Sequence, residues 1–337
     1  MYRGYGVAAN AYLTTVNFDE ATRLTTVRES AFEDCDHLQS DIDFSNTSLK
    51  TIEKGAFFDC FSLKNVTFSN MLETIGKQAF QETKIKNISL PGTLKRLGYK
   101  AFHDCDNATT LSFSPGEGIL WCDMEDDRCN TFTSCGNLTS LYLGRDIYWS
   151  DESKKCASPF YDSYFTNVVI DDNVYHLGNF LFQHSNKLQA LSIGKKVKEI
   201  PNECFNETKE IQSFILTDGE EPITLGNSCA NFKVRSLYMG RPIEDIENIP
   251  GGRVDDTKAM ELLQVGPCVS EIKSLSFNNF HNLKTVTLPA NITVKSKAFF
   301  ICGIQELYVQ GDAHFETQSF TKCYKLHPYF FHFHHLF

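Results

Sequence analysis

The 337-residue chain lacks the long apolar runs, the surplus of basic residues and the leader segment that mark several common classes of protein. No run of 18 or more apolar residues occurs, so the sequence predicts no membrane insertion. Lys and Arg (32) are outnumbered by Asp and Glu (42), and the net charge of −10 argues against a nucleic-acid partner or an anionic membrane surface. Residues Met1–Phe18 lack the charged, apolar and small-residue sections of a signal peptide.

Catalytic motifs are missing as well. The sequence contains no G-x-S-x-G, no H-E-x-x-H and no Gly-rich phosphate loop. The histidines before the C-terminal segment share no spacing that would gather them into one site: His37, His103, His176, His184, His281 and His314. We therefore expect no enzymatic activity, no cofactor and no metal site.

Only two Trp are present, whereas Phe accounts for 28 of the 337 residues. Many of these Phe recur every 21–25 residues, with some longer intervals, and usually follow a small residue such as Ala56 or Ala79. One copy, Cys229-Ala230, has lost the aromatic residue and predicts a weak point. The anchor phenylalanines of the repeat are Phe32, Phe57, Phe80, Phe102, Phe132, Phe160, Phe182, Phe205, Phe277, Phe299 and Phe320.

Apolar residues recur six, nine and eleven positions after each anchor, as Leu63, Val66 and Phe68 do after Phe57. Alternation such as Val66-x-Phe68 is typical of a short strand with one buried face. A unit of about 23 residues cannot bury its apolar positions alone, but stacked units bury those of their neighbours. The pattern therefore predicts a repeat solenoid with one parallel strand per repeat, in which the anchor Phe rings form a continuous spine.

The segment Leu49–Phe68 reads Leu-x-x-Ile-x-x-x-Ala-Phe-x-x-Cys-x-x-Leu-x-x-Val-x-Phe and resembles the BspA-type leucine-rich repeat. The Leu-Pro pairs that begin at Leu90 and Leu288 fit the same family, as do the Leu-Tyr-x-Gly-Arg segments that end at Arg145 and Arg241. The resemblance implies a mostly β leucine-rich repeat solenoid, a curved right-handed array of about 13 coils over residues 1–337. It also implies an extracellular or cell-surface bacterial protein that binds other proteins, and it carries over no catalytic residues.

Several segments depart from the repeat. Residues 239–273 contain Pro and Gly that break it, and we expect an irregular insertion or degenerate repeat with a short helix over Asp255–Gln264. Residues 115–128 and 146–156 are predicted to be long loops. Both ends of the chain look truncated inside a coil, because repeat offsets continue from Val7 at one end and to Phe331 at the other.

Most of the twelve Cys occupy repeat positions, which favours buried packing over disulfides or zinc. Those at repeat positions are Cys35, Cys60, Cys105, Cys135, Cys204, Cys229, Cys302 and Cys323. The others are Cys122, Cys129, Cys156 and Cys268, of which Cys122 and Cys129 are close enough for a loop disulfide in an oxidising compartment. At the C-terminus, His332, His334 and His335 suggest either weak metal binding or an irregular chain end.

The outward strand positions predict a small, polar, mostly uncharged face on which a ligand would bind. The candidate binding residues are Thr67, Ser89, Ser112, Tyr142, Ser192, Tyr238, Thr287 and Tyr308. Because Tyr is enriched in protein interfaces, the three Tyr predict a protein partner such as a host matrix or surface protein. Two alternatives remain open: a glycan-binding or spacer element that uses Trp121 or Trp149, and Ser and Thr that are merely suited to exposed strands.

Overall fold

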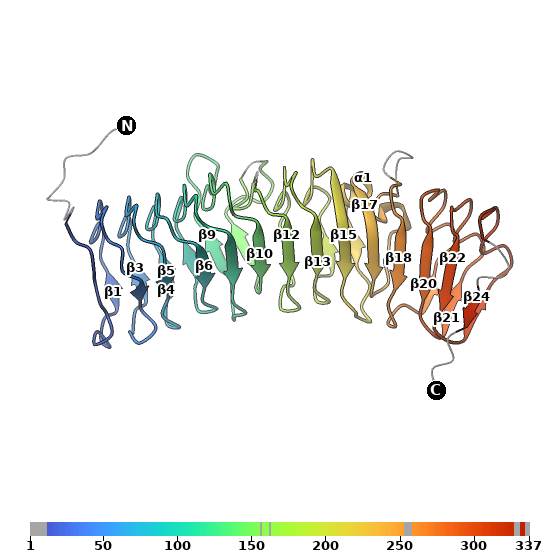
Figure 1. Cartoon of the computed structure of the whole chain (residues 1–337), viewed down its shortest axis with the longest axis horizontal. Coiled ribbons are helices and arrows are strands. Elements are labelled where there is room, and N and C mark those ends of the chain that lie inside the picture. The colour runs from blue at the N-terminus through green and yellow to red at the C-terminus, as the bar shows by residue number, and fades with distance from the viewer. Residues whose placement is uncertain (1–11, 156, 162, 253–257, 327–330, 334–337) are drawn as a thin grey trace. The chain divides into compact units, whose positions relative to one another are not determined.

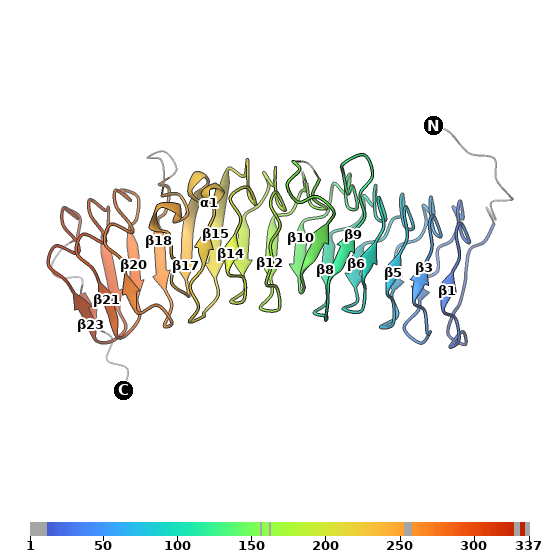
Figure 2. The same cartoon turned by 180° about the vertical axis from the view of Figure 1, so that it is seen from behind.

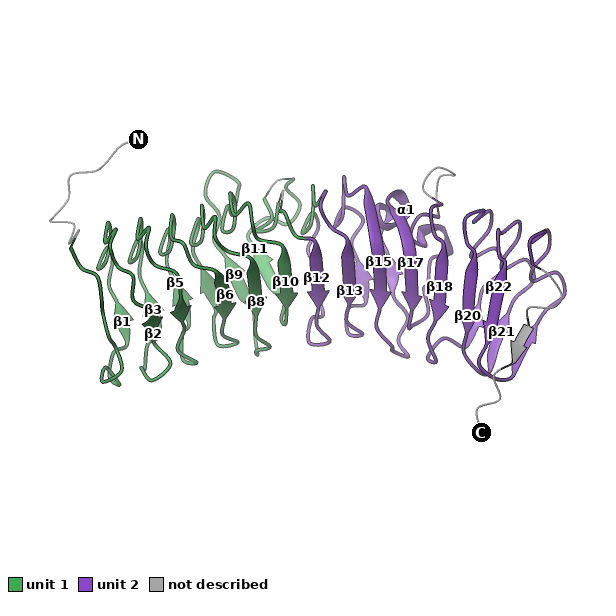
Figure 3. Cartoon of the chain, in the orientation of Figure 1, with its two compact units in different colours: residues 1–165, 180–185 green, residues 166–179, 186–337 purple. Residues whose placement is uncertain are grey.

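Each repeat folds into one coil that carries strands on two sides, and neighbouring coils pair strand to strand in parallel (Figure 1). The computed structural model describes residues 12–155, 157–161, 163–252, 258–326 and 331–333. The chain divides into unit 1, residues 1–165 and 180–185, and unit 2, residues 166–179 and 186–337 (Figure 3). We call the strands that follow the anchor Phe the main sheet, and the strands that precede it the second sheet.

In unit 1 the second sheet is the longer of the two. Its strands pair in the order β1 (Thr26–Val27), β3 (Thr51–Ile52), β5 (Thr74–Ile75), β7 (Arg96–Leu97), β9 (Leu120–Cys122) and β11 (Ile147–Trp149). The main sheet consists of the pair β2 (Ile42–Asp43) and β4 (Val66–Thr67), and of β6 (Asn87–Leu90), β8 (Thr110–Phe113) and β10 (Ser140–Leu143).

In unit 2 the main sheet dominates. Its strands pair in the order β12 (Asn167–Ile170), β13 (Ala190–Ile193), β15 (Glu210–Leu216), β17 (Lys233–Met239), β18 (Leu262–Val265), β20 (Thr285–Leu288), β22 (Glu306–Val309) and β24 (Phe331–Phe333). The second sheet comprises β14 (Glu199–Ile200) with β16 (Thr224–Leu225), and β19 (Glu271–Ile272) with β21 (Ile292–Val294) and β23 (Ala313–Phe315). The described helices are α1 (Asn227–Asn231) and the 3-10 turn η1 (Ile246–Asn248).

The parallel repeat solenoid predicted from the Phe spacing is confirmed, and its strands bury alternate side chains as the offsets require. In β8, for example, Leu111 and Phe113 are buried while Thr110 is exposed. The apolar-x-x-apolar segments upstream of the anchors form the second sheet, which gives a coil a second set of main-chain bonds to its neighbours. Among the described residues, no helix has the length and apolar character to cross a membrane.

The anchor Phe rings stack from Phe32 to Phe182 in unit 1 and from Phe277 to Phe320 in unit 2, whereas Phe205 packs edge-on against Phe232. In unit 1, Phe57 and Phe80 lie 5.2 Å apart between ring centroids with an interplanar angle of 5°, and the stack continues on both sides from Phe32 to Phe182. In unit 2, Phe299 and Phe320 lie 5.1 Å apart at 1°. The backbone joins the stack at many anchors: the Phe57 N–H, for example, donates to the Ala79 carbonyl of the next coil at 2.8 Å.

Positive backbone φ angles flank most anchors and produce the tight turn from which the ring points inward. Around Phe57 they occur at Gly55 (φ 60°) and Asp59 (φ 61°), two residues before and two residues after the ring. Asp and Asn tolerate this left-handed region better than most residues, whereas a β-branched residue is strained there. Ile301, with φ 57°, therefore occupies the equivalent position at a cost in free energy.

The loops predicted over residues 115–128 and 146–156 contain strands β9 and β11, so the prediction is wrong for those strand residues. The helix predicted over Asp255–Gln264 is wrong where the chain is described, because Leu262–Val265 forms β18 and pairs in parallel with both β17 and β20. At the copy that lacks its anchor ring, Phe232 supplies an aromatic side chain from the end of α1 and packs edge-on against Phe205, 6.1 Å away. Val7 and Tyr329 lie outside the described residues, whereas Leu13, Val16 and Phe18, at the offsets from Val7, are half-buried, and Phe18 packs edge-on against Phe32, 6.2 Å away.

Candidate functional site

The outward side chains of the main sheet form rows, because parallel pairing places equivalent residues of successive strands side by side. In unit 1, Ser89, Ser112 and Tyr142 are in register across β6, β8 and β10. The Ser112 Oγ donates to the Ser89 Oγ at 3.2 Å. Thr67 is exposed on β4, where its register partner is Asp43.

In unit 2 one outward row contains four of the predicted residues. We call this row the unit 2 ridge, and its members in order are Val169, Ser192, Ile215, Tyr238, Gln264, Thr287 and Tyr308. Ser192, Tyr238, Thr287 and Tyr308 are thus brought onto one row, whereas Tyr142 belongs to unit 1. At a spacing of about 4.8 Å per strand, Tyr238 and Tyr308 are about 14 Å apart along the row.

Sequence reasoning missed the apolar members of this surface. Val169 and Ile215 on the ridge are 42% and 37% exposed, and Leu262 on the neighbouring outward row is 38% exposed. A signal for Ile215 was available, because the inward offsets of that repeat are Phe214 and Leu216, which places the residue between them outward. The outward position of Leu262 was missed because the residue was assigned to the predicted helix over Asp255–Gln264. The ridge is therefore less polar than predicted.

Tyr238 is held in one orientation by its hydroxyl, which donates to the Asp218 Oδ1 at 2.7 Å. Burial and this hydrogen bond to a carboxylate raise the pKa of Tyr238 to about 12. The phenol has room because residue 266 is Gly: a Cβ there would lie 2.8 Å from the Tyr238 hydroxyl and 2.4 Å from Asp218. The ring is consequently a preorganised contact surface rather than a mobile side chain.

Paired charges border the ridge where the strands begin. Arg235 donates from Nε to Glu210 at 2.8 Å and from Nη1 to Glu261 at 2.9 Å, and Lys284 binds Glu261 at 2.7 Å. Hydrogen bonding from Arg235 lowers the pKa of Glu210, so this carboxylate is ionised at neutral pH. Because these charges neutralise one another, the surface beside them offers apolar and hydroxyl contacts more than a net field.

The two Leu-Tyr-x-Gly-Arg segments have an internal role. Arg145 and Arg241 are buried, and each guanidinium donates to backbone carbonyls of turns far back in the chain. Arg241 donates from Nη1 to Lys195 and Val197 at 2.7 Å each, and from Nη2 to Gly194 at 3.0 Å. Burial lowers the pKa of Arg241 to about 10, which leaves the side chain protonated at neutral pH. These arginines stabilise coils and are not available to a ligand.

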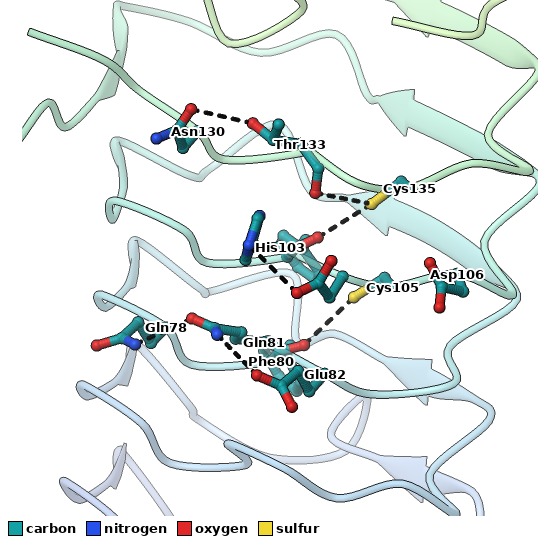
Figure 4. Close-up of polar contacts among 12 residues, drawn as sticks. Gln78, Phe80, Gln81, Glu82, His103, Cys105, Asp106, Asn130, Thr133 and Cys135 are labelled. Atoms are coloured by element: carbon teal, nitrogen blue, oxygen red, sulfur yellow. Dashed lines mark hydrogen bonds and ion pairs between the residues drawn. The ribbon is translucent and has the colours of Figure 1, made fainter. Parts of the chain in front are cut away.

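The cysteines three residues after the anchors use their thiols as hydrogen-bond donors. Cys105 donates to the Phe80 carbonyl at 3.3 Å, and Cys135 donates to the Phe102 carbonyl at 3.1 Å (Figure 4). The same bond to the anchor carbonyl one coil earlier is made by Cys60, Cys302 and Cys323. The slot therefore suits a small donor in these coils, and Thr83, which fills it in another coil, donates instead to the Phe80 carbonyl of its own coil at 3.0 Å.

The remaining candidates have separate locations. Cys122 and Cys129 are free and buried, and Cys122 ends strand β9; Cys156 lies outside the described residues. Trp149 is buried, whereas Trp121 is 46% exposed on β9. Within the described ranges, no three His, Cys, Asp or Glu side chains gather in a way that would hold a metal ion. The side chains of His332, His334 and His335 are outside those ranges.

Solved structures of bacterial repeat proteins share similarity with this chain. A leucine-rich repeat protein from Bacteroides ovatus is 17% identical, with 90% of this chain and 81% of that chain covered at a TM-score of 0.38. The pneumococcal vaccine antigen PcpA is 18% identical, with 90% and 88% covered at a TM-score of 0.28. A leucine-rich repeat protein from Eubacterium ventriosum is 14% identical, with 81% and 82% covered at 0.34. A search of the curated proteins finds no match.

The sequence itself matches a known repeat. The model of the BspA type leucine rich repeat region, with 6 copies, matches residues 8–115, 156–249 and 246–327. The matched ranges cover well over half of the chain and include both units. They contain most of the anchor Phe, Cys-slot and outward strand positions described above, whereas Phe132, Cys135 and Tyr142 lie in the unmatched residues 116–155. The resemblance seen in Leu49–Phe68 is confirmed, and this chain belongs to the BspA-type leucine-rich repeat family.

Proposed function

We propose that the chain is a non-catalytic protein-binding module that acts at the surface of a bacterium, and that the unit 2 ridge is its main contact surface. The carrying observation is the exposure of large apolar side chains on an otherwise regular outward row, Val169 and Ile215 among them. Leucine-rich repeat solenoids generally serve as scaffolds for binding other proteins. Ile215 is adjacent to Tyr238 on this row, and exposed apolar groups rimmed by polar residues mark such contact sites.

The chemistry of the ridge suits a protein partner. Ile215 and Tyr238 are register partners on β15 and β17, so an aliphatic and an aromatic group lie side by side. Tyr contributes contact area and a hydroxyl with little loss of side-chain entropy, and Asp218 already restrains this one. The neutralised charges of Arg235, Glu210 and Glu261 form a polar rim of the kind that surrounds interface cores.

The partner that we propose is a host matrix or surface protein, which would make the chain part of an adhesin. The experiment is surface plasmon resonance with the full chain over immobilised fibronectin, laminin and collagen. Replacement of the three predicted tyrosines by Ser (Y142S, Y238S and Y308S together) is expected to weaken binding at least tenfold without changing the melting temperature. Addition of I215S should weaken it further, because that change removes the apolar neighbour of Tyr238.

The matched control is Tyr175→Ser, which removes a Tyr of unit 2 that is 57% exposed away from the ridge. This variant is expected to bind as the wild type does. Unchanged affinity in the triple variant would reject the ridge as the contact surface and favour the view that its Ser, Thr and Tyr are only suited to exposed strands. Absence of binding to every matrix protein tested would reject the adhesin role.

A further inference from the structure

The second sheet of unit 1 carries an outward row whose character changes along the chain. The row begins with three register-paired threonines and continues, one residue per strand, with large planar side chains; its members are Thr26, Thr51, Thr74, Arg96, Trp121 and Tyr148. Figure 2 views the molecule from behind, with β1, β3, β5 and β9 of this sheet labelled. Thr is common on any exposed strand, so the three Thr need no functional explanation. The change from Thr to Arg, Trp and Tyr along the same row does need one.

A groove of about 650 Å³ lies beside the planar end of this row, and Tyr99, Trp121 and Met124 supply its apolar lining. The Trp121 ring is 46% exposed and lies 5.8 Å from the Tyr148 ring at an angle of 43°. The other Trp of the chain, Trp149, is 2% exposed and belongs to the core. A planar or ring-shaped ligand could stack on an indole ring that is exposed beside a groove.

The charged groups of the groove are paired with one another. Arg96 donates from Nε to both Asp123 oxygens, at 2.9 and 3.0 Å, and Lys77 binds Glu125 at 2.6 Å. The third cation, Lys95, is paired with Glu73 at 2.9 Å. Three cations and three carboxylates thus cancel, which disfavours a charged ligand and favours a neutral one.

Hydrogen-bonding capacity remains in the groove. In the part of the chain that the structure describes, no contact occupies Nη1 and Nη2 of Arg96 or the indole N–H of Trp121. The carboxylate of Asp123 has further lone pairs beyond those that Arg96 uses. The site therefore offers unoccupied donors and acceptors within reach of an aromatic face.

We propose that this groove binds a neutral saccharide, with a pyranose ring stacked on Trp121. A pyranose has an apolar face of C–H groups that suits an aromatic ring, and its hydroxyls both donate and accept hydrogen bonds. Arg96 would donate to ring hydroxyls, and Asp123 would accept from them. The groove lies wholly in unit 1 and is separate from the unit 2 ridge, so this proposal stands or fails independently of the proposed protein partner.

The experiment uses the full chain and a panel of neutral oligosaccharides: cellohexaose, xylohexaose, mannohexaose and N-acetylchitohexaose. In the Trp149→Phe variant Trp121 is the single Trp, so its emission reports on the groove alone. We expect at least one oligosaccharide to change that emission saturably. By calorimetry, W121A should weaken the same binding at least tenfold and D123N at least threefold.

The matched control is Phe61→Ala, which removes an exposed aromatic side chain of unit 1 outside the groove and should leave the affinity unchanged. The proposal is overturned if none of the four oligosaccharides alters Trp121 emission. It is equally overturned if W121A binds the saccharide as tightly as the wild type does, or if an aromatic peptide competes for Trp121 and no saccharide does. The circular dichroism spectrum and melting temperature of W121A show whether that variant folds. D123N retains the indole and so tests the groove a second time without it.

Discussion

The guanidinium of Arg241 donates to the carbonyl oxygen of Val197 at 2.7 Å, across 44 residues of sequence. Arg145 makes the equivalent bond to Leu94 at 2.8 Å across 51 residues. In both cases a buried cation satisfies turn carbonyls that no strand partner reaches, and Nη1 serves two carbonyls at once. The Leu-Tyr-x-Gly-Arg segment is therefore a stabilising element that links turns distant in the sequence.

Replacement of Arg241 by Met should destabilise unit 2 by about 3 kcal/mol, because three buried carbonyls lose a charged donor. Urea unfolding followed by circular dichroism measures this loss. Arg235→Met is the matched control: its ion pairs are solvent-exposed, so it should cost under about 1 kcal/mol. A similar, small effect of both substitutions would refute the stabilising role.

Truncation of one stacked anchor, Phe80→Ala, should cost about 3–5 kcal/mol, since Phe80 is fully buried between the rings of Phe57 and Phe102. The control, Phe61→Ala, removes a ring that is 44% exposed and should change the free energy of unfolding little. Hydrogen exchange should show faster opening in the coils beside Phe80 and little change in distant coils, because coupling runs between neighbours. Uniform loss of protection would contradict this view.

The strained turn at Ile301 offers a stabilising substitution. Asn at this position, where φ is 57°, should raise the free energy of unfolding by about 1 kcal/mol, because Asn tolerates the left-handed region. The reciprocal change, Asn279→Ile, places a β-branched residue at φ 63° in the preceding coil and should be destabilising. Thermal melts of both variants check the pair, and shifts of the same sign in both would exclude backbone strain as the cause.

Buried thiols should make stability fall in alkaline solution. Burial raises the pKa of Cys229 to about 12 from an ordinary value near 9, so the fold favours the neutral thiol. This contribution is complete below pH 9 and is lost as the pH rises toward 12, by up to about 1.4 kcal/mol per pH unit. In Cys229→Ala the contribution is absent, so the stability difference between wild type and variant should shrink from pH 9 to 10.5. A constant difference over that range would contradict the prediction.

The coil and its core could be predicted because both depend on residues that lie close together in the sequence. Residues such as Phe57, Leu63 and Val66 recur at fixed offsets, and strand alternation converts the offsets directly into inward and outward positions. The binding surface was predicted only in part. The Ser and Tyr of the ridge were found, but Leu262 was lost because the Pro- and Gly-rich stretch before it obscured the repeat.

Relationships over longer distances were beyond sequence reasoning. The Arg241 carbonyl partners lie 44–47 residues away, and their position depends on how the turns of separate coils come together. The difference between Trp121 and Trp149 was also missed, since both were assigned to irregular loops. The alternation Leu120-Trp121-Cys122, buried–exposed–buried, contains that information once the segment is known to be a strand.

The strand ladders between coils are made by main-chain groups, so they do not depend on which side chain occupies an outward row. Ser112 and Tyr142 occupy the same place in consecutive strands, although one is a small alcohol and the other a large phenol. Natural variation at such places can therefore change what the protein recognises while the scaffold is inherited intact. Diversification of recognition among related chains should concentrate there.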